Sequence, residues 1–338
     1  MKPKADMNSI GSKRKFEFNN TMGILVVIVV FSIVLSFISK NFLTVDNMVV
    51  LARNSSITIM VGLAQMVVMS GGGMNVSVGA IGSVSAVLCG AFMQRLGIPW
   101  PIAILIAICG GAICGALNGL FITGLGGTGE ISWLTTLATS SAFTGVSLGI
   151  THAKPFYNLP AGYNWIGSYN IGGFLPLMIV ICLVFTILVG ILFKYTSLGR
   201  QILALGGNSK AAALSGIPIK KIIIIKHIIS AVIAASAGIL FSTRLGSINP
   251  DIGGDWMLFS FAAPLIGGTR MEGGRVNVVG AFLGGLLLSM VSNGVVHMRV
   301  NVYLVEFIEG LIILIAVGMD RIRAIREEKR ERLERSAI

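Results

Sequence analysis

The feature that most constrains this chain is a series of long segments without any charged residue. No Asp, Glu, Lys or Arg occurs from residue 54 to residue 94, a stretch of 41 residues. About 20 mostly apolar residues suffice for one helix to cross a bilayer, so this stretch has room for two. Segments of this kind need lipid rather than water as their solvent, and the sequence therefore predicts a polytopic membrane protein.

Composition excludes two other classes of protein. Hydrophobic residues make up 54% of the 338 residues and charged residues only 12%, whereas soluble domains carry about 25% charged residues. Disorder requires low hydrophobicity and high net charge, so the composition also excludes a disordered chain. The net charge of +12 comes from basic residues gathered at the margins of the apolar segments. That placement is typical of membrane topology, and no nucleic-acid partner is expected.

Ten segments are candidates for membrane spans. They are 22–38, two spans within 54–94 separated by a glycine-rich turn near 70–75, 98–122, 131–150, 174–193, 222–241, 256–267, 276–296 and 302–319. The segment 256–267 is short and contains Pro264, which indicates a re-entrant or broken helix. The sequence therefore predicts an all-α polytopic membrane protein with about ten transmembrane helices.

The distribution of Lys and Arg predicts the orientation of the chain. With ten spans and a cytoplasmic N-terminus, the cytoplasmic segments hold 20 of the 26 basic residues and the outer loops hold six. Cytoplasmic loops are enriched in Lys and Arg, so both termini are expected inside. The expected organisation is a basic tail at 1–20, a transmembrane domain at 21–319 with a cytoplasmic loop at about 194–221, and a charged tail at 320–338.

Almost no ionisable side chain lies inside the predicted spans. Ion-coupled carriers place Asp, Glu, His or Arg there to bind the coupling ion or relay protons, so the sequence does not favour an ion-driven carrier. The polar side chains expected to line a route for a neutral hydrophilic cargo are Gln65, Asn75, Asn118 and Thr136. The alternative for each of them is that it hydrogen-bonds across helices and holds the bundle together.

Glycines recur at near-helical spacing within two predicted spans. One span contains Gly111, Gly115 and Gly119, and another contains Gly280 and Gly284. Small residues let helices approach closely, so close packing is the favoured role. In addition, the stretch 72–80 reads like the stretch 273–281. Transporters are often built from internal repeats, and this pair indicates one.

The sequence contains no arrangement typical of a catalytic or metal site. The four cysteines, at 89, 109, 114 and 182, have neither CxxC spacing nor a paired His, and the three histidines are isolated. No GxxxxGK[ST] phosphate-binding loop occurs, so any ATP hydrolysis is expected on another chain. We therefore expect no enzymatic activity, metal or cofactor in this chain.

The predicted cytoplasmic loop carries the most specific motif. Residues 199–217 read GRQILALGGNSKAAALSGI. The alanine-rich part from Ser209 to Ser215 follows Asn208, and Asn and Ser favour helix N-caps, so the motif predicts a short helix bounded by glycines. Such a helix is suited to docking a partner protein. The alternative is a loop that lies on anionic lipid through the six basic residues from Lys194 to Lys226.

This motif and several others resemble the membrane-spanning permease subunit of ribose-type sugar ABC importers. The similarity runs from about Asn41 to Asp320. Its other pieces are 41–47 (NFLTVDN), 72–79 (GGMNVSVG), 117–119 (LNG), 136–139 (TLAT), 244–247 (RLGS), 267–269 (GGT) and 273–275 (GGR). The turn at 72–79 departs from the family pattern, which has Asp where this chain has Asn75.

The resemblance implies a transport subunit without chemistry of its own. Two permeases, identical or homologous, would form the pathway for a monosaccharide or similar small neutral solute in the bacterial inner membrane. Two ATPase subunits that use ATP and Mg would dock beneath, and a solute-binding protein would deliver the sugar from outside. The residues that the resemblance assigns to the ATPase-coupling loop are Gly199, Gly206, Gly207, Asn208, Ala211, Ala212 and Gly216.

Charged residues of the outer loops are expected to dock the binding protein, because exposed charges of both signs orient a partner and speed its association. The candidates are Arg244, Asp251, Asp255 and Arg299.

Other functions stay open at this point. Permeases for nucleosides or for branched-chain amino acids look broadly similar, although an amino acid would need polar partners at both of its charged ends. From a different class, the alternative is a facilitator or channel that works without ATP. Such a protein would have no use for the 199–217 segment.

Overall fold

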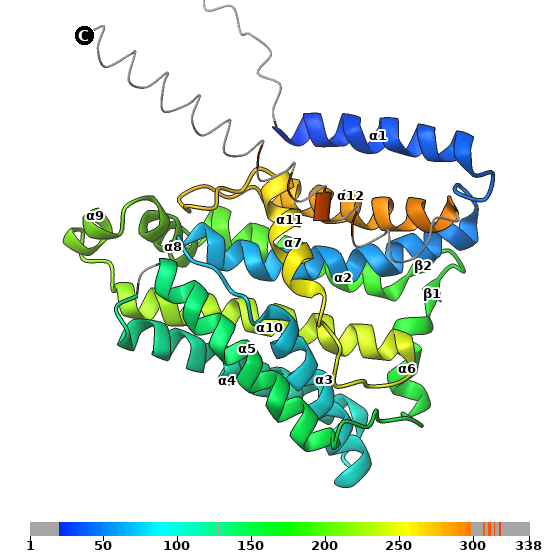
Figure 1. Ribbon diagram of the computed structural model, residues 1–338, viewed down its shortest axis with the longest axis horizontal. Helices are drawn as coiled ribbons and strands as arrows, with labels where there is room; N and C mark the ends of the chain where they lie inside the picture. The colour runs from blue at the N-terminus through cyan, green and yellow to red at the C-terminus, as the bar shows by residue number, and fades with distance from the viewer. Residues whose placement is uncertain are drawn as a thin grey trace, which may run out of the picture.

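The computed structural model of the chain describes residues 20–127, residues 129–298 and the single positions 307, 310, 311, 314 and 318. The described part is almost entirely helical (Figure 1). Its elements are α1 (Asn20–Ile38), α2 (Val45–Ser70), α3 (Val78–Arg95), α4 (Trp100–Gly124), α5 (Gly129–Thr151), α6 (Ala161–Ser168), β1 (Asn170–Ile171), β2 (Leu175–Pro176), α7 (Leu177–Tyr195), α8 (Ser197–Gly207), α9 (Ser209–Leu214), α10 (Ile219–Leu245), α11 (Trp256–Ile266) and α12 (Val278–His297). The predicted tails, apart from Asn20, and most of the predicted tenth span lie outside these residues.

Among the described residues, seven helices are long and apolar enough to cross a membrane, namely α1, α2, α3, α4, α7, α10 and α12. Each coincides with a predicted span, which confirms the prediction of an all-α polytopic membrane protein. Two other predicted spans, α5 and α11, do not meet these criteria of length and hydropathy. Helix α5 has 23 residues, but Ser and Thr residues lower its hydropathy, and α11 has only 11 residues and contains Pro264.

Helix α10 packs against α4, α3 and α2, and glycines make the closest of these contacts possible. A β-carbon on Gly115 would lie 2.5 Å from the Ala231 side chain, and one on Gly119 would lie 2.5 Å from the α-carbon of Ile224. Helices α11 and α12 meet in the same way, because a β-carbon on Gly284 would lie 2.2 Å from the Ala263 carbonyl oxygen. The predicted packing role of these glycines is confirmed.

The helices run between two ends of the molecule (Figure 1). Helices α8 and α9 lie at one end, called here the α9 end. Helix α6 and the β1–β2 hairpin lie at the opposite end, called the α6 end. The hairpin is antiparallel and pairs Ile171 with Leu175. A further bridge at the α6 end joins Phe156 to Ile248. The sequence did not predict this short sheet or α6.

Candidate coupling site and buried polar network

Helices α8 and α9 replace the single loop that the sequence predicted at 194–221. Each begins at a side chain that caps its free main-chain amides. The Thr196 hydroxyl accepts a hydrogen bond of 3.0 Å from the amide of Gly199, and the Asn208 side-chain oxygen accepts one of 3.0 Å from the amide of Ala211. The predicted short helix and its Asn208 cap are confirmed. The Asn208 cap satisfies a free amide at the start of α9 and so stabilises a helix of only six residues.

The predicted coupling residues have different surroundings on these two helices. Gly199 packs against α7, where a β-carbon would lie 2.1 Å from the Leu192 carbonyl oxygen. Ala212 is buried and Ala211 is exposed. Leu214, which the sequence analysis did not single out, is 91% exposed at the end of α9. Leu214 is therefore the most exposed large apolar side chain among the described residues.

Gly206 brings α8 into contact with two turns that are far apart in the sequence. A β-carbon on Gly206 would lie 2.2 Å from the Ser70 carbonyl oxygen and 2.6 Å from the Gly274 amide nitrogen. The Gly274 amide donates a hydrogen bond of 2.9 Å to that same Ser70 oxygen. Gly72 and Gly273 complete this contact, since a β-carbon on Gly273 would lie 2.6 Å from the Gly72 amide nitrogen. We call Gly72, Gly206, Gly273 and Gly274 the glycine junction.

The glycine junction joins the two stretches that the sequence analysis found to be alike. The stretch 72–80 connects α2 to α3, and the stretch 273–281 connects α11 to α12. Both lead into a helix through an asparagine. The Asn75 side-chain oxygen accepts a hydrogen bond of 3.2 Å from the Ser77 amide, and that of Asn277 accepts one of 2.9 Å from the Gly280 amide. The end of α8 therefore contacts two equivalent turns at once.

Lys226 stabilises the end of α2, next to the glycine junction. The sequence analysis counted it with the cytoplasmic loop, but it is buried in α10. Its ammonium donates hydrogen bonds of 3.3 Å to the Val68 carbonyl oxygen and 2.9 Å to that of Gly71. The last carbonyl groups of a helix lack partners within the helix, and a cation there also favours the helix dipole. Lys226 therefore holds the end of α2 against α10.

The four predicted pathway residues come together around the turn between α2 and α3. The Asn75 side chain donates to the Ser230 hydroxyl at 3.1 Å, and Asn118 donates to the Ser77 hydroxyl at 2.7 Å. Thr136 accepts a hydrogen bond of 3.0 Å from the Val76 amide. All four residues, Gln65, Asn75, Asn118 and Thr136, have no solvent-exposed surface.

Gln65 completes this network through the main chain of Asn75. With its amide oriented to satisfy both groups, its nitrogen donates to the Asn75 carbonyl oxygen at 2.9 Å and its oxygen accepts from the Asn75 amide at 3.2 Å. In this conformation the network binds the turn to α2, α4, α5 and α10. It thus takes the helix-linking role that the sequence analysis gave as the alternative.

The predicted docking charges that the structure describes differ in their exposure. Asp251 and Asp255 are exposed in the connection between α10 and α11. Arg244 is not a loop residue: it lies in the last turn of α10, partly buried, and its guanidinium donates to the side chain of Asn54. Arg299 lies outside the described residues.

Helix α5 carries a polar region that the sequence analysis did not assign to the pathway. A cavity of about 160 Å³ lies between α3, α5 and the connection that precedes α11. Ser140, Ser141 and Thr144 of α5 face Ser83 and Asp251 across it. Along the other exposed side of α5, β-carbons on Gly145 and Gly149 would meet no atom within 4 Å. This side therefore has room for a neighbouring molecule.

Among the described residues, the structure is a helix bundle in which seven helices are long and apolar enough to cross a membrane, which defines the chain as a polytopic membrane protein. The family described as "Branched-chain amino acid transport system / permease component" matches residues 47–317. The chain belongs to this family of transport permease components. No solved structure gives a significant match to it.

Three of its relatives carry the names of sugar permeases. The chain is 31% identical to the D-allose transport system permease protein of Escherichia coli K12, over 83% of this chain and 85% of the relative. It is 32% identical to the ribose import permease protein of Bacillus subtilis 168, over 86% and 89% of the two chains. The galactose/methyl galactoside import permease protein of Escherichia coli K12 is 26% identical, over 95% and 100%.

Proposed function

We propose that the chain is the membrane-spanning permease subunit of an ATP-driven importer for a monosaccharide. The observation that carries this proposal is the α8–α9 pair. Helix α9 exposes Leu214 to a partner, while α8 ends on the glycine junction that joins the α2–α3 and α11–α12 turns. The printed names of the relatives, for ribose, allose and galactose, support a sugar as cargo.

Coupling to ATP follows from the packing of α8. A separate ATPase subunit, which uses ATP and Mg, binds to α9. Because main-chain atoms meet without side chains between them at Gly206, a displacement of α9 passes through α8 to both turns with little loss. The two turns lead into α3 and α12. Movement of one docking helix thereby changes the tilt of helices in both halves of the subunit.

The chain crosses the membrane ten times with both termini in the cytoplasm. The ten crossings are the seven apolar helices, α5, α11 and the span expected from the sequence at 302–319. The α9 end faces the cytoplasm, since exposed Lys194, Arg200, Lys210, Lys220 and Lys221 gather there. The α6 end faces outward, where Asp251 and Asp255 are exposed to a solute-binding protein.

Helix α5 lines the pathway together with a second permease subunit. The Ser and Thr hydroxyl groups make α5 too polar to be surrounded by lipid on every side. Its glycines leave room for a helix of the second subunit. Neutral hydroxyl groups can exchange hydrogen bonds with a sugar and need no coupling ion. The buried Gln65, Asn75, Asn118 and Thr136 lie behind this surface and join the pathway when the turn between α2 and α3 moves.

The experiment is purification of the tagged permease from its native membrane, with mass spectrometry of the proteins that accompany it. We expect an ATPase that carries the GxxxxGK[ST] loop. Leu214→Asp should release that ATPase, because a carboxylate replaces the exposed apolar contact. Leu96→Asp is the matched control, since Leu96 is 65% exposed at the α6 end. Ala211→Asp should act like Leu214→Asp, because Ala211 is also exposed.

Solute uptake gives the second measurement. Reconstituted permease with its ATPase should accumulate a monosaccharide only when ATP is present. A permease that purifies alone and equilibrates sugar across liposomes without ATP would instead be a facilitator. Uptake of branched-chain amino acids in place of sugars would leave the coupling proposal intact and overturn the cargo.

A further inference from the structure

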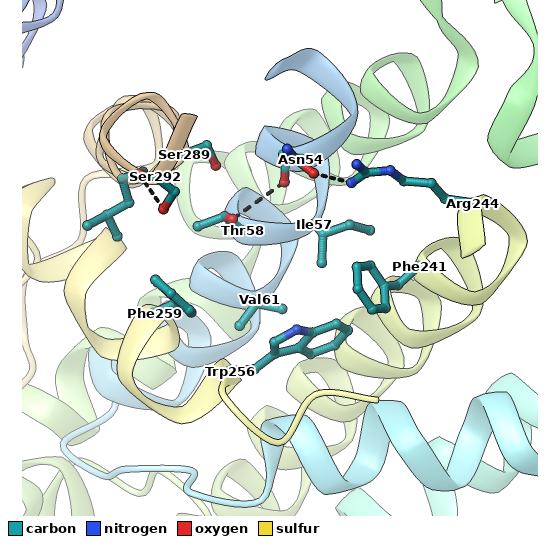
Figure 2. A pocket seen from close by; sticks show the side chains of 11 residues that line it. Asn54, Ile57, Thr58, Val61, Phe241, Arg244, Trp256, Phe259, Ser289 and Ser292 are labelled. Carbon is teal, nitrogen blue, oxygen red and sulfur yellow. Dashed lines mark hydrogen bonds between the residues drawn. The ribbon is translucent and has the colours of Figure 1, made fainter. Parts of the chain in front are cut away.

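A second cavity lies near the α6 end, on the far side of α10 from the α5 surface. It measures about 190 Å³ and is enclosed by α2, α10, α11 and α12 (Figure 2). At about 30 Å³ for each water molecule in the liquid, this volume equals about six waters. Cavities for drug-sized ligands measure about 300–1,000 Å³. The cavity therefore suits one small ring.

The walls of this cavity divide into an aromatic side and a polar side. Figure 2 shows Trp256 and Phe241 on one side, with their rings packed edge to face at 5.8 Å between centroids. Asn54, Arg244 and Ser289 lie on the opposite side. An aromatic face beside a few convergent polar groups is the usual design of a small-molecule site.

Two polar groups on that wall are available to a ligand. The Ser289 hydroxyl oxygen is buried without a hydrogen-bond partner, and the residue is only 4% exposed. A buried hydroxyl without a partner costs stability, so its presence needs an explanation. The Arg244 guanidinium has five donors, and its recorded hydrogen bond is to the Asn54 side chain.

The charge of the wall selects among cargo classes. Among the described residues that line the cavity there is no Asp, Glu or His, and Arg244 is the one ionised group. An amino acid would place its ammonium without a carboxylate partner in a largely buried space, which is unfavourable. The hydroxyl groups of a sugar can both donate to Asn54 or Ser289 and accept from Arg244, while its apolar face rests on Trp256.

We infer that this cavity is a second binding site, for a single monosaccharide, held within one subunit at its outer end and separate from the α5 surface. The inference rests on the proposed function, because the outward position and the sugar cargo come from it. The site would receive sugar at the outer face before the sugar enters the pathway.

Equilibrium binding to the full chain in lipid nanodiscs tests this inference, with labelled D-ribose, D-allose, D-galactose and L-leucine as probes. We expect saturable binding of at least one sugar and none of L-leucine. Ser289→Ala should weaken sugar binding by about tenfold, the value of one hydrogen bond to a buried group. It should leave the thermal midpoint unchanged, because no protein group loses a partner. Trp256→Ala should weaken binding further, and Trp165→Ala, an exposed tryptophan at the same end, should not.

Each outcome decides the inference. Absence of saturable sugar binding overturns it, as does binding that both Ser289→Ala and Trp256→Ala leave unchanged. Displacement of the sugar by L-leucine overturns the assigned class of ligand. If ATP-dependent sugar uptake persists while the cavity variants have no effect on binding, the inference fails and the proposed function stands. If the variants weaken binding but uptake needs no ATP, the proposed coupling fails instead.

Discussion

The ammonium of Lys226 donates a hydrogen bond of 2.9 Å to the main-chain carbonyl oxygen of Gly71, across 155 residues of sequence. This contact places a buried basic residue of α10 at the end of α2, beside the glycine junction. It links the helix at the centre of the bundle to the turn that α8 contacts. The proposed coupling site is therefore built on the packed core of the subunit.

Replacement of Lys226 tests this link. Lys226→Met keeps the length of the side chain but leaves the Gly71 carbonyl oxygen without its donor, while the Val68 carbonyl oxygen keeps the hydrogen bond from the Gly71 amide. Unsatisfied buried acceptors cost about 1–3 kcal/mol, so we expect a lower free energy of unfolding and a lower thermal midpoint in detergent. Lys221→Met on the same helix is the control, since Lys221 is exposed. Equal midpoints for the two variants would show that Lys226 does not support the turn.

Two adjacent glycines give a sharp test of the glycine junction. Gly206→Ala forces a β-carbon to within 2.2 Å of the Ser70 carbonyl oxygen, whereas in Gly207→Ala the nearest atom lies 3.9 Å away. Overpacking of this kind costs about 1–3 kcal/mol. We expect Gly206→Ala to lower ATP-dependent uptake and the thermal midpoint, and Gly207→Ala to keep both near their original values. If the two variants behave alike, main-chain contact at Gly206 is not needed for coupling.

The cap of α9 is tested by Asn208→Ala. Loss of an N-cap side chain costs about 0.5–2 kcal/mol, and a helix of six residues has little other stabilisation. We expect weaker ATPase binding, measured by co-purification, and recovery in Asn208→Ser, because serine also caps helices. Failure of Asn208→Ser to recover binding would mean that the partner contacts Asn208 directly.

The amide at position 75 is tested by Asn75→Asp. A carboxylate cannot donate to the Ser230 hydroxyl, and it would be buried without a solvent-exposed surface. We expect a loss of about 1–3 kcal/mol in the free energy of unfolding. Asn249→Asp is the control, because Asn249 is exposed and its side-chain oxygen only accepts a hydrogen bond, from the Asp251 amide. An unchanged midpoint for Asn75→Asp would mean that the Ser230 hydroxyl reverses its role and donates to the carboxylate.

Much of the fold could be predicted from the sequence, because the helices depend on local properties. Long apolar runs predict spans wherever they occur, and α1, α7 and α12 begin and end close to their predicted limits. The cap at Asn208 and the packing of Gly115 and Gly119 are also local patterns, since they depend on residue type and helical spacing. Helix α6 and the β1–β2 hairpin could not be predicted, because neither has a periodic pattern long enough to detect.

The sequence by itself therefore determined the class of protein, the long apolar helices and the short helix α9, since hydropathy, capping and helical spacing act over a few residues. Only the tertiary structure decided that Gly206 meets Ser70 and Gly274, that Lys226 is buried rather than in a loop, and that Arg244 lines a cavity. It also placed Gln65, Asn75, Asn118 and Thr136 in one network. Such contacts join residues far apart in the sequence, and they depend on how the shapes of whole helices fit together.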